Sequence, residues 1–256
     1  MANAKRKKSK PTVKEMKFRN DPMVRLYDKT QEWLQESGRP FIIGVGVVAG
    51  LILLYTAGYY ITSYRHSNAE KALAAALTKF NAPVVDTPGP NQTGKYYTDE
   101  KLKWQESAEA LEKVAKDYPG YYGVIGKYYA GAAYLHFDKA KGQQLLQQAA
   151  DKNDQPTSDL ARLALAENYV VDGDDAKATE LYEKILNSSF VPKQVVQIAL
   201  AREYEKGGDK QKAIDLYFAA AQQDRSSLAG SDAEKHLAAL APDRVKDLPA
   251  PTPGEP

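Results

Sequence analysis

The chain has 256 residues, of which 27% are charged and 43% hydrophobic, a composition typical of a folded protein rather than a disordered one. It contains no cysteine, which excludes disulfides, thiolate nucleophiles and cysteine-based zinc sites. The net charge of +2 hides an asymmetry, because residues 1–40 hold 11 Lys or Arg against 5 Asp or Glu, whereas the remainder holds 24 against 28. We therefore expect a basic N-terminal segment and a mildly acidic body.

The basic segment has two parts. Residues 1–20 are rich in Lys and poor in apolar side chains, which predicts a disordered cytosolic tail. Residues 21–39 begin with an Asp-Pro pair typical of a helix start, and they predict a juxtamembrane amphipathic helix that ends at Gly38 and Pro40. Two interpretations of this helix stay open: it lies on the inner membrane surface, or it is a plain connector.

Residues 40–64 contain no charged side chain and predict one transmembrane helix, because about 20 apolar residues cross a hydrocarbon core of about 30 Å. Lys and Arg are concentrated before this span, so the positive-inside rule predicts a cytoplasmic N-terminus and an exported C-terminal part. The long leader favours an uncleaved anchor over a signal peptide. Gly46 and Gly50 predict helix packing within the membrane, with self-association and a different partner both open.

After the span, residues 65–97 predict an Ala-rich helix from Ala69 to Phe80 and then a loop rich in Pro and Gly. Residues 98–242 predict helices joined by short turns, and the Pro-rich residues 243–256 predict a disordered tail. The predicted helices of the larger segment are Asp99–Tyr118, Tyr121–Phe137, Gln143–Ala150, Asp159–Val171, Ala176–Leu186, Lys193–Lys206, Gln211–Gln223 and Ser231–Leu240.

A pattern repeats every 35 residues within this larger segment. Six positions hold the same register in two successive units, which predicts a stacked array of helix hairpins rather than one globule. An earlier unit around Gly131 and Gly142 follows the pattern with a connection one residue shorter. The matched pairs are Leu165 and Leu200, Ala166 and Ala201, Tyr169 and Tyr204, Gly173 and Gly208, Ala178 and Ala213, and Tyr182 and Tyr217.

These hairpins resemble the tetratricopeptide repeat (TPR) family, a helix-turn-helix unit of 34 residues. In that family the first helix carries a bulky residue, a small residue and then an aromatic residue one turn later, as Leu165, Ala166 and Tyr169 do. The resemblance covers residues 98–224. It implies a TPR-like α-solenoid that binds other polypeptides. Together with the predicted span, we therefore expect an all-α chain in which a single N-terminal transmembrane helix is followed by this solenoid.

The layout of the whole chain adds a second resemblance. A basic leader, the approach Gln31–Arg39, a Gly- and Val-rich span, the sequence Ala69–Leu73 and TPR-like hairpins follow one another. This order is similar to the YfgM-type family of ancillary SecYEG translocon subunits. The resemblance implies a bacterial inner-membrane protein whose periplasmic domain assists exported proteins beside periplasmic chaperones. An alternative with the same topology is an envelope scaffold for cell-wall or division machinery, and the basic leader opposes a third alternative, a cytosolic TPR receptor.

The first helices of stacked hairpins line the concave side of a solenoid, where a partner binds. The repeat register therefore predicts an apolar groove for a segment of a client or chaperone. A competing prediction is that the chain's own helix at residues 69–80 or 231–240 fills this groove. The predicted groove residues are Ile125, Tyr128, Ala132, Leu135, Leu160, Leu163, Glu167, Val170, Val195, Ile198, Arg202 and Glu205.

The sequence carries no pattern typical of catalysis. It has no G-x-S-x-G, P-loop or G-x-G-x-x-G motif, and His66, His136 and His236 have no second ligand at metal-binding spacing. The acidic turn Asp172–Asp175 lacks the ligand pattern of an EF-hand. We therefore predict a protein without enzymatic activity, metal or cofactor, which binds protein partners and no nucleic acid.

Overall fold

The computed structural model describes residues 22–87, 93–152 and 156–250. The predicted basic tail, residues 1–20, lies outside these described residues. The same holds for residues 251–256 of the predicted C-terminal tail.

The regular elements of the described residues are helices, accompanied by one isolated parallel bridge between Val84 and Tyr97. The all-α class predicted from the sequence is confirmed. The chain divides into two compact units, Met1–Tyr64 and Arg65–Pro256, which are described separately below.

The described part of the first unit belongs to one long helix, α2 (Pro22–Phe80). The helix end predicted at Gly38 and Pro40 is wrong, because Pro40 lies inside α2. A proline removes one backbone hydrogen bond from a helix interior, and the apolar turns on its C-terminal side continue the helix here. From Pro40 to Phe80, α2 is long and apolar enough to cross a membrane by length and composition. Its most apolar window of 18 residues has a mean hydropathy of 2.2 and no buried residue.

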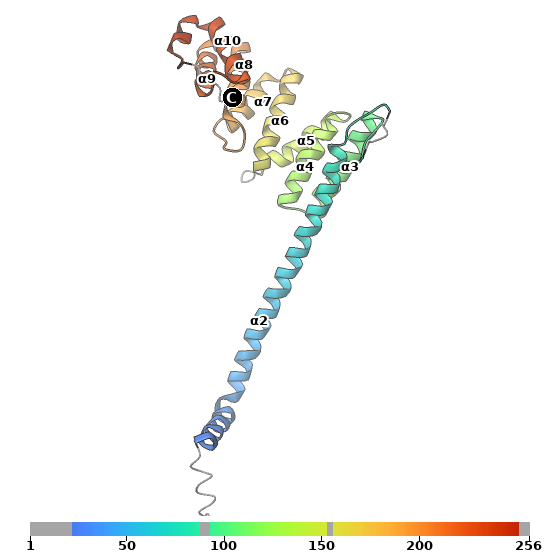
Figure 1. Cartoon of the computed structure of the whole chain (residues 1–256), viewed down its shortest axis with the longest axis vertical. Helices are drawn as coiled ribbons and strands as arrows, with labels where there is room; N and C mark the ends of the chain where they lie inside the picture. The colour runs from blue at the N-terminus through green and yellow to red at the C-terminus, as the bar shows by residue number, and fades with distance from the viewer. Residues whose placement is uncertain (1–21, 88–92, 153–155, 251–256) are drawn as a thin grey trace, which may run out of the picture. The chain divides into compact units, whose positions relative to one another are not determined.

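The second unit is a series of antiparallel helices in which each helix packs against the next (Figure 1). Residues 65–80 of α2 begin the series, and every helix predicted from the sequence is present, with bounds that differ by a few residues. The helices are α3 (Glu100–Asp117), α4 (Tyr121–Tyr134), α5 (Lys139–Ala150), α6 (Pro156–Asp172), α7 (Asp175–Ile185), α8 (Lys193–Lys206), α9 (Lys210–Gln223) and α10 (Leu228–Leu240), followed by the 3-10 helix η1 (Pro242–Asp247).

The turns of two successive hairpins have the same geometry. Gly173 and Gly208 have φ of +74° and +83°, a region that favours glycine. In both turns the next residue, an aspartate, donates its N–H to the carbonyl of the repeat tyrosine at 2.9 Å and caps the following helix at 3.3 Å. A lysine then lies over the tyrosine ring, at 5.0 and 4.6 Å from its centroid. The matched sets are Tyr169, Gly173, Asp174 and Lys177, and Tyr204, Gly208, Asp209 and Lys212.

The shorter connection of the earlier unit forms the same turn without glycine. Asp138 donates its N–H to the Tyr134 carbonyl at 2.7 Å and accepts the N–H of Lys141 at 3.1 Å. The Lys141 ammonium lies 4.1 Å from the centre of the Tyr134 ring. Because Asp138 caps α5, this helix begins at Lys139, four residues earlier than predicted. The tyrosine, aspartate and lysine therefore define the turn more consistently than glycine does.

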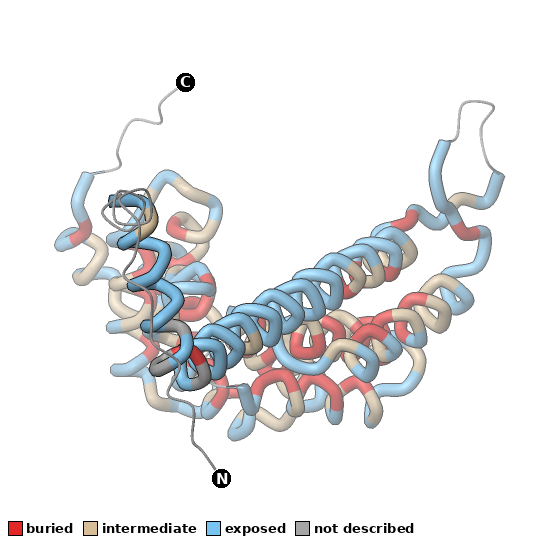
Figure 2. The backbone as a smooth tube through the Cα atoms, turned by 90° about the horizontal axis from the view of Figure 1, so that it is seen from below, coloured by how far each residue is buried: buried red, intermediate tan, exposed pale blue. Residues whose placement is uncertain are grey.

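Buried residues, coloured red in Figure 2, recur along the helices of the hairpin series. The C-terminal end of this core includes Leu248, which is 7% exposed and packs in one cluster with Tyr217 and Leu237. Arg225 also donates from Nη1 to the Pro249 carbonyl at 3.1 Å. The disorder predicted for residues 243–256 is therefore wrong for residues 243–250, since an apolar side chain between the prolines anchors them to the core.

Candidate protein-binding face

Helix α6 has a buried face on one side and a half-exposed, largely apolar face on the other. Ala161 and Leu165 are completely buried in the core. The predicted groove positions recur at intervals of three or four residues, which places them together on the other side of the helix. Most of them are half-buried and pack against the margin of the core. These α6 positions are Leu160, Leu163, Glu167 and Val170.

Helix α4 continues this face with aromatic side chains. The Tyr128 and Tyr129 rings lie 4.8 Å apart between their centroids, and Phe80 packs against Tyr129 at 5.3 Å. The four predicted positions of α4 are half-buried; Tyr128 and Leu135 pack against the same core cluster as the α6 row, whereas Ile125 packs against the cluster that contains Leu73. They are Ile125, Tyr128, Ala132 and, directly after the helix, Leu135.

The ionisable groups on this face have shifted pKa values. Burial raises the pKa of Glu167, although its side chain retains contact with solvent. Burial also raises the pKa of Tyr128, and the negative charges of Tyr129 and Glu167 raise it further. Many protein atoms thus surround side chains that water still reaches, which is the environment expected on a concave wall. Here we define the binding face as the predicted positions of α4 and α6 together.

Helix α8 differs because α10 packs over Ile198 and contacts two other predicted positions. Ile198 is 7% exposed and packs in the same cluster as Leu237 of α10. Arg202 donates from Nη2 to the carboxylate of Asp232 at 2.6 Å. Glu205 accepts a hydrogen bond from the Tyr217 hydroxyl at 2.9 Å, and its carboxylate lies 3.3 Å from Nδ1 of His236. Of the four α8 positions, Val195 alone is a large exposed apolar side chain.

Residues 69–80 occupy the other end of the hairpin series. Leu73 and Ala76 share a cluster with Leu111 of α3 and Ala130 of α4. The cluster beneath the α6 part of the binding face contains, among the described residues, no side chain from residues 69–80 or from α10. The chain's own helices therefore pack at the two ends of the predicted groove, and neither joins the core beneath its α6 part.

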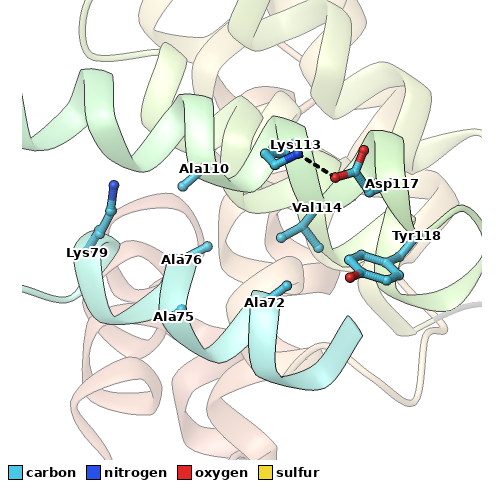
Figure 3. A pocket seen from close by; sticks show the side chains of 9 residues that line it. All are labelled: Ala72, Ala75, Ala76, Lys79, Ala110, Lys113, Val114, Asp117 and Tyr118. Carbon is cyan, nitrogen blue, oxygen red and sulfur yellow. Dashed lines mark hydrogen bonds and ion pairs between the residues drawn. The ribbon is translucent and has the colours of Figure 1, made fainter. Parts of the chain in front are cut away.

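The sequence did not predict a hollow of about 230 Å³ between α2 and α3. Small alanine side chains on both helices leave this space, and Lys113 and Asp117 form an ion pair of 2.7 Å at its rim (Figure 3). The alanine spacing on the two helices is the signal that would have located it. The lining residues are Ala72, Ala75, Ala76, Lys79, Ala110, Lys113, Val114, Asp117 and Tyr118.

Gly46 and Gly50 lie on an α2 surface with open space around them, because an added Cβ would meet no atom within 4 Å at either position. A shallow hollow on this helix is lined by Gly44, Val48 and Ala49 among others. At 3.6 residues per turn, this hollow lies on the opposite side of the helix from Gly46 and Gly50. Packing through either side remains a prediction.

The histidines take part in packing. His136 stacks on Trp104 with ring centroids 3.8 Å apart, and burial lowers the pKa of His136. His236 stacks on Tyr217 at 4.8 Å. In the part of the chain that the structure describes, no group of three or more His, Cys, Asp or Glu side chains is arranged to hold a metal ion.

Comparisons with known proteins give the following matches. No family model matches the chain, and no curated protein does. Among solved structures it is similar to a Podosopora anserina protein of the kinesin light chain type with nearly identical TPR-like repeats, at 19% identity, over 55% of this chain and 79% of that chain, with a TM-score of 0.45. It is also similar to MamA AMB-1, at 16% identity, over 73% of this chain and 86% of that chain, with a TM-score of 0.47. The TPR-like character described here follows from the hairpins and turns of the chain itself.

Proposed function

We propose that the chain is a non-catalytic protein–protein interaction module whose binding face accepts an apolar or amphipathic polypeptide segment. In this proposal the module is anchored in a bacterial inner membrane by residues 40–64. Its N-terminus is cytoplasmic and its hairpins are periplasmic. There it assists exported proteins at the Sec translocon, beside periplasmic chaperones.

The observation that carries the binding proposal is the contrast between α6 and α8. At α8, helix α10 packs over Ile198 and binds the side chains of Arg202 and Glu205, whereas the apolar positions of α6 are half-exposed and share no core cluster with α10. Leu160, Leu163 and Val170 therefore retain apolar area that a partner can remove from water. Helical repeats generally use this side for recognition.

The membrane part of the proposal is supported by two features of the first unit. The most apolar window of α2 contains no buried residue, so its side chains have no protein core to occupy. Lysines and arginines are numerous before this window, whereas Arg65 and Lys71 are the nearest ones after it. Such a helix is stable in lipid, and the charge asymmetry favours a cytoplasmic N-terminus.

Photo-crosslinking in living cells tests the binding face. A photoreactive residue at Leu163 should form adducts with other polypeptides, and Tyr128→Asp in the same chain should reduce their yield about tenfold, since a central interface residue contributes about 1.4 kcal/mol or more. Leu102, which is 47% exposed on α3, provides the matched control position. Equal adducts from Leu163 and Leu102, in chains with the same far-UV circular dichroism, would exclude this face.

Two further measurements test the anchoring and the partners. Alkaline phosphatase fused after residue 250 should be active, because it folds only outside the cytoplasm; an inactive, intact fusion would refute the exported orientation. Mass spectrometry of the Leu163 adducts identifies the partners. Translocon subunits, chaperones and secreted chains support the proposed role, whereas cell-wall or division proteins would assign the envelope scaffold instead.

A further inference from the structure

One edge of the second unit collects the starts of several helices. First helices of stacked hairpins run parallel, so α4, α8 and α10 begin at the same edge as residue 65. Two contacts agree with this order locally: the rings of His66 and Tyr122 lie 5.7 Å apart beside the start of α4, and the Ser227 hydroxyl before α10 lies 3.4 Å from Oε1 of Gln194 near the start of α8. We call this the start edge, and we call the opposite edge, with the hairpin turns, the turn edge.

The start edge contains a cavity of about 400 Å³ between α3, α4 and the end of α5. Lys127 and Lys152 both line it, and neither ammonium group has an ion-pair or hydrogen-bond partner among the described residues. Gly120 and Gly123 form part of the wall; Gly120 is exposed, whereas Gly123 is buried against the backbone at the end of α3. The other lining residues are Ala115, Pro119 and Val124. Two unpaired cations in one cavity favour a phosphate group as ligand.

Large apolar side chains are exposed at helix starts along the same edge. Tyr121, the first residue of α4 and a neighbour of the cavity, is 53% exposed. Phe190 before α8 is 55% exposed, and Leu228, the first residue of α10, is 93% exposed. Aromatic and aliphatic side chains beside lysines are the combination that favours a membrane interface over water.

The capping residues distinguish the two edges by charge. The four α-helices that begin at the turn edge, α3, α5, α7 and α9, are capped by aspartate, whereas the described N-caps of α-helices at the start edge are uncharged. Of the acids at the start edge, Asp117 forms an ion pair with Lys113 and Asp159 with Arg162, whereas Asp151 and Asp224 accept hydrogen bonds from the uncharged side chains of Gln147 and Ser226. The aspartate caps are Asp99, Asp138, Asp174 and Asp209, and the uncharged caps are Gly120, Pro192 and Ser227.

We propose that this cavity binds the phosphate of an anionic phospholipid headgroup, with Lys127 and Lys152 as its ligands and with Tyr121, Phe190 and Leu228 in the lipid interface. The inference rests on the proposed function, because the span that ends at Tyr64 brings residue 65, and hence the start edge, within reach of a bilayer. The lysines then hold this edge of the hairpin unit on the leaflet, and the acidic caps lie at the edge farther from it.

The first experiment measures headgroup binding. The full chain in an uncharged detergent is titrated with short-chain phosphatidylglycerol, phosphatidylcholine or inorganic phosphate, and adducts are counted by native mass spectrometry. Lys127→Gln with Lys152→Gln should weaken phosphatidylglycerol binding about 25-fold, since each lysine near an anionic surface contributes about fivefold. Lys101→Gln with Lys210→Gln makes the same charge change at the turn edge and should have little effect. Equal affinities for both double variants would overturn the proposal.

The second experiment measures contact with lipid. Because the chain has no cysteine, a single introduced cysteine carries a fluorophore at Tyr121, Phe190 or Leu228, with Thr98 of the turn edge as control. In nanodiscs with brominated phosphatidylglycerol, the first three probes should be quenched at least about fivefold more than the fourth, and the lysine double variant should abolish this difference.

The outcomes are distinguishable from one another. Uniform quenching at both edges would overturn lipid docking, and so would tight binding of inorganic phosphate without any quenching, which would assign a free-anion site. A chain that fails to co-elute with nanodiscs at all would instead refute the membrane anchoring of the proposed function. Preserved far-UV circular dichroism in each variant establishes that folding is intact.

Discussion

For the substitution Gly142→Ala, the repeat pattern of the sequence and the structure of the hairpin α4–α5 predict opposite changes in stability. In the two regular units this position is alanine, Ala178 and Ala213, and both are completely buried. Pattern matching therefore predicts that alanine stabilises the chain, by about 1 kcal/mol from helix propensity. The structure predicts the reverse. An added Cβ would lie 2.8 Å from the backbone nitrogen of Leu135 and 2.9 Å from the carbonyl oxygen of Gly131, and backbone atoms cannot move aside as side-chain ends do.

Overpacking of this kind typically costs about 1–3 kcal/mol, so after the propensity gain we expect a net loss of about 1 kcal/mol or more for Gly142→Ala. Urea denaturation of the full chain in detergent, followed by the fluorescence of Trp104 in the adjoining cluster, measures the change. Gln144→Ala, at an exposed site of the same helix, is the control and should stay within about 0.5 kcal/mol. A variant about 1 kcal/mol more stable than the parent would refute the close approach of α4 and α5.

Three further predictions concern single side chains. Gly208→Ala should destabilise the unit by about 1 kcal/mol in urea titrations, since φ is +83° there; an unchanged midpoint would contradict the turn geometry. The hydrogen bond from the Tyr97 hydroxyl at 2.8 Å, aided by nearby Lys95 and Lys79, lowers the pKa of Glu106. Its stabilisation is therefore present above the unfolded pKa of about 4.3 and is lost as the pH falls through the lower folded value, so Glu106→Gln should flatten the acid limb of a stability–pH profile. Burial raises the pKa of Glu203, whose Oε2 has no hydrogen-bond partner. The folded chain then holds this proton more tightly than the unfolded one, so stability decreases as the pH rises above about 4.3, and Glu203→Gln should raise the urea midpoint at pH 7; a lower midpoint would show that its 3.8 Å pair with Lys206 dominates.

The sequence predicted the hairpins because the buried face of a helix and the positions of its ends are both set by residues close together in the chain. The spacing of Leu165, Ala166 and Tyr169 sets one buried face, and the glycines near the turns set the helix ends. Two predicted boundaries, the helix end at Pro40 and the start of the C-terminal tail, were wrong because they depend on residues elsewhere in the chain. Pro40 does not stop α2, since the apolar turns after it continue the helix, and Leu248 orders residues that composition alone assigns to a tail.

The binding face was only partly predictable for the same reason. The 35-residue register places equivalent positions on α6 and α8, but a register contains no information about which helix packs next. Ile198 is covered because α10 returns onto α8, and a contact between segments more than 30 residues apart leaves no periodic trace. The cavity beside Lys127 and Lys152 was missed because its two lysines lie on α4 and just after α5, at positions that the repeat pattern does not include.

Helices of the chain itself cover both ends of the hairpin array, and this limits the length of the peptide that the binding face can accept. A helical array exposes apolar area at its first and last hairpins unless other segments cap them. Here residues 69–80 pack at the first end, and α10 seals the last with Ala233 and Leu237, both completely buried. The face left over spans α4 and α6, two helices whose axes lie about 10 Å apart at normal packing distance. Two helix widths amount to about 20 Å, which an extended peptide crosses in about six residues at 3.3 Å each. A partner is therefore expected to present a short apolar motif, and a tandem of two such motifs should bind no more tightly than one, because a second motif would meet α10.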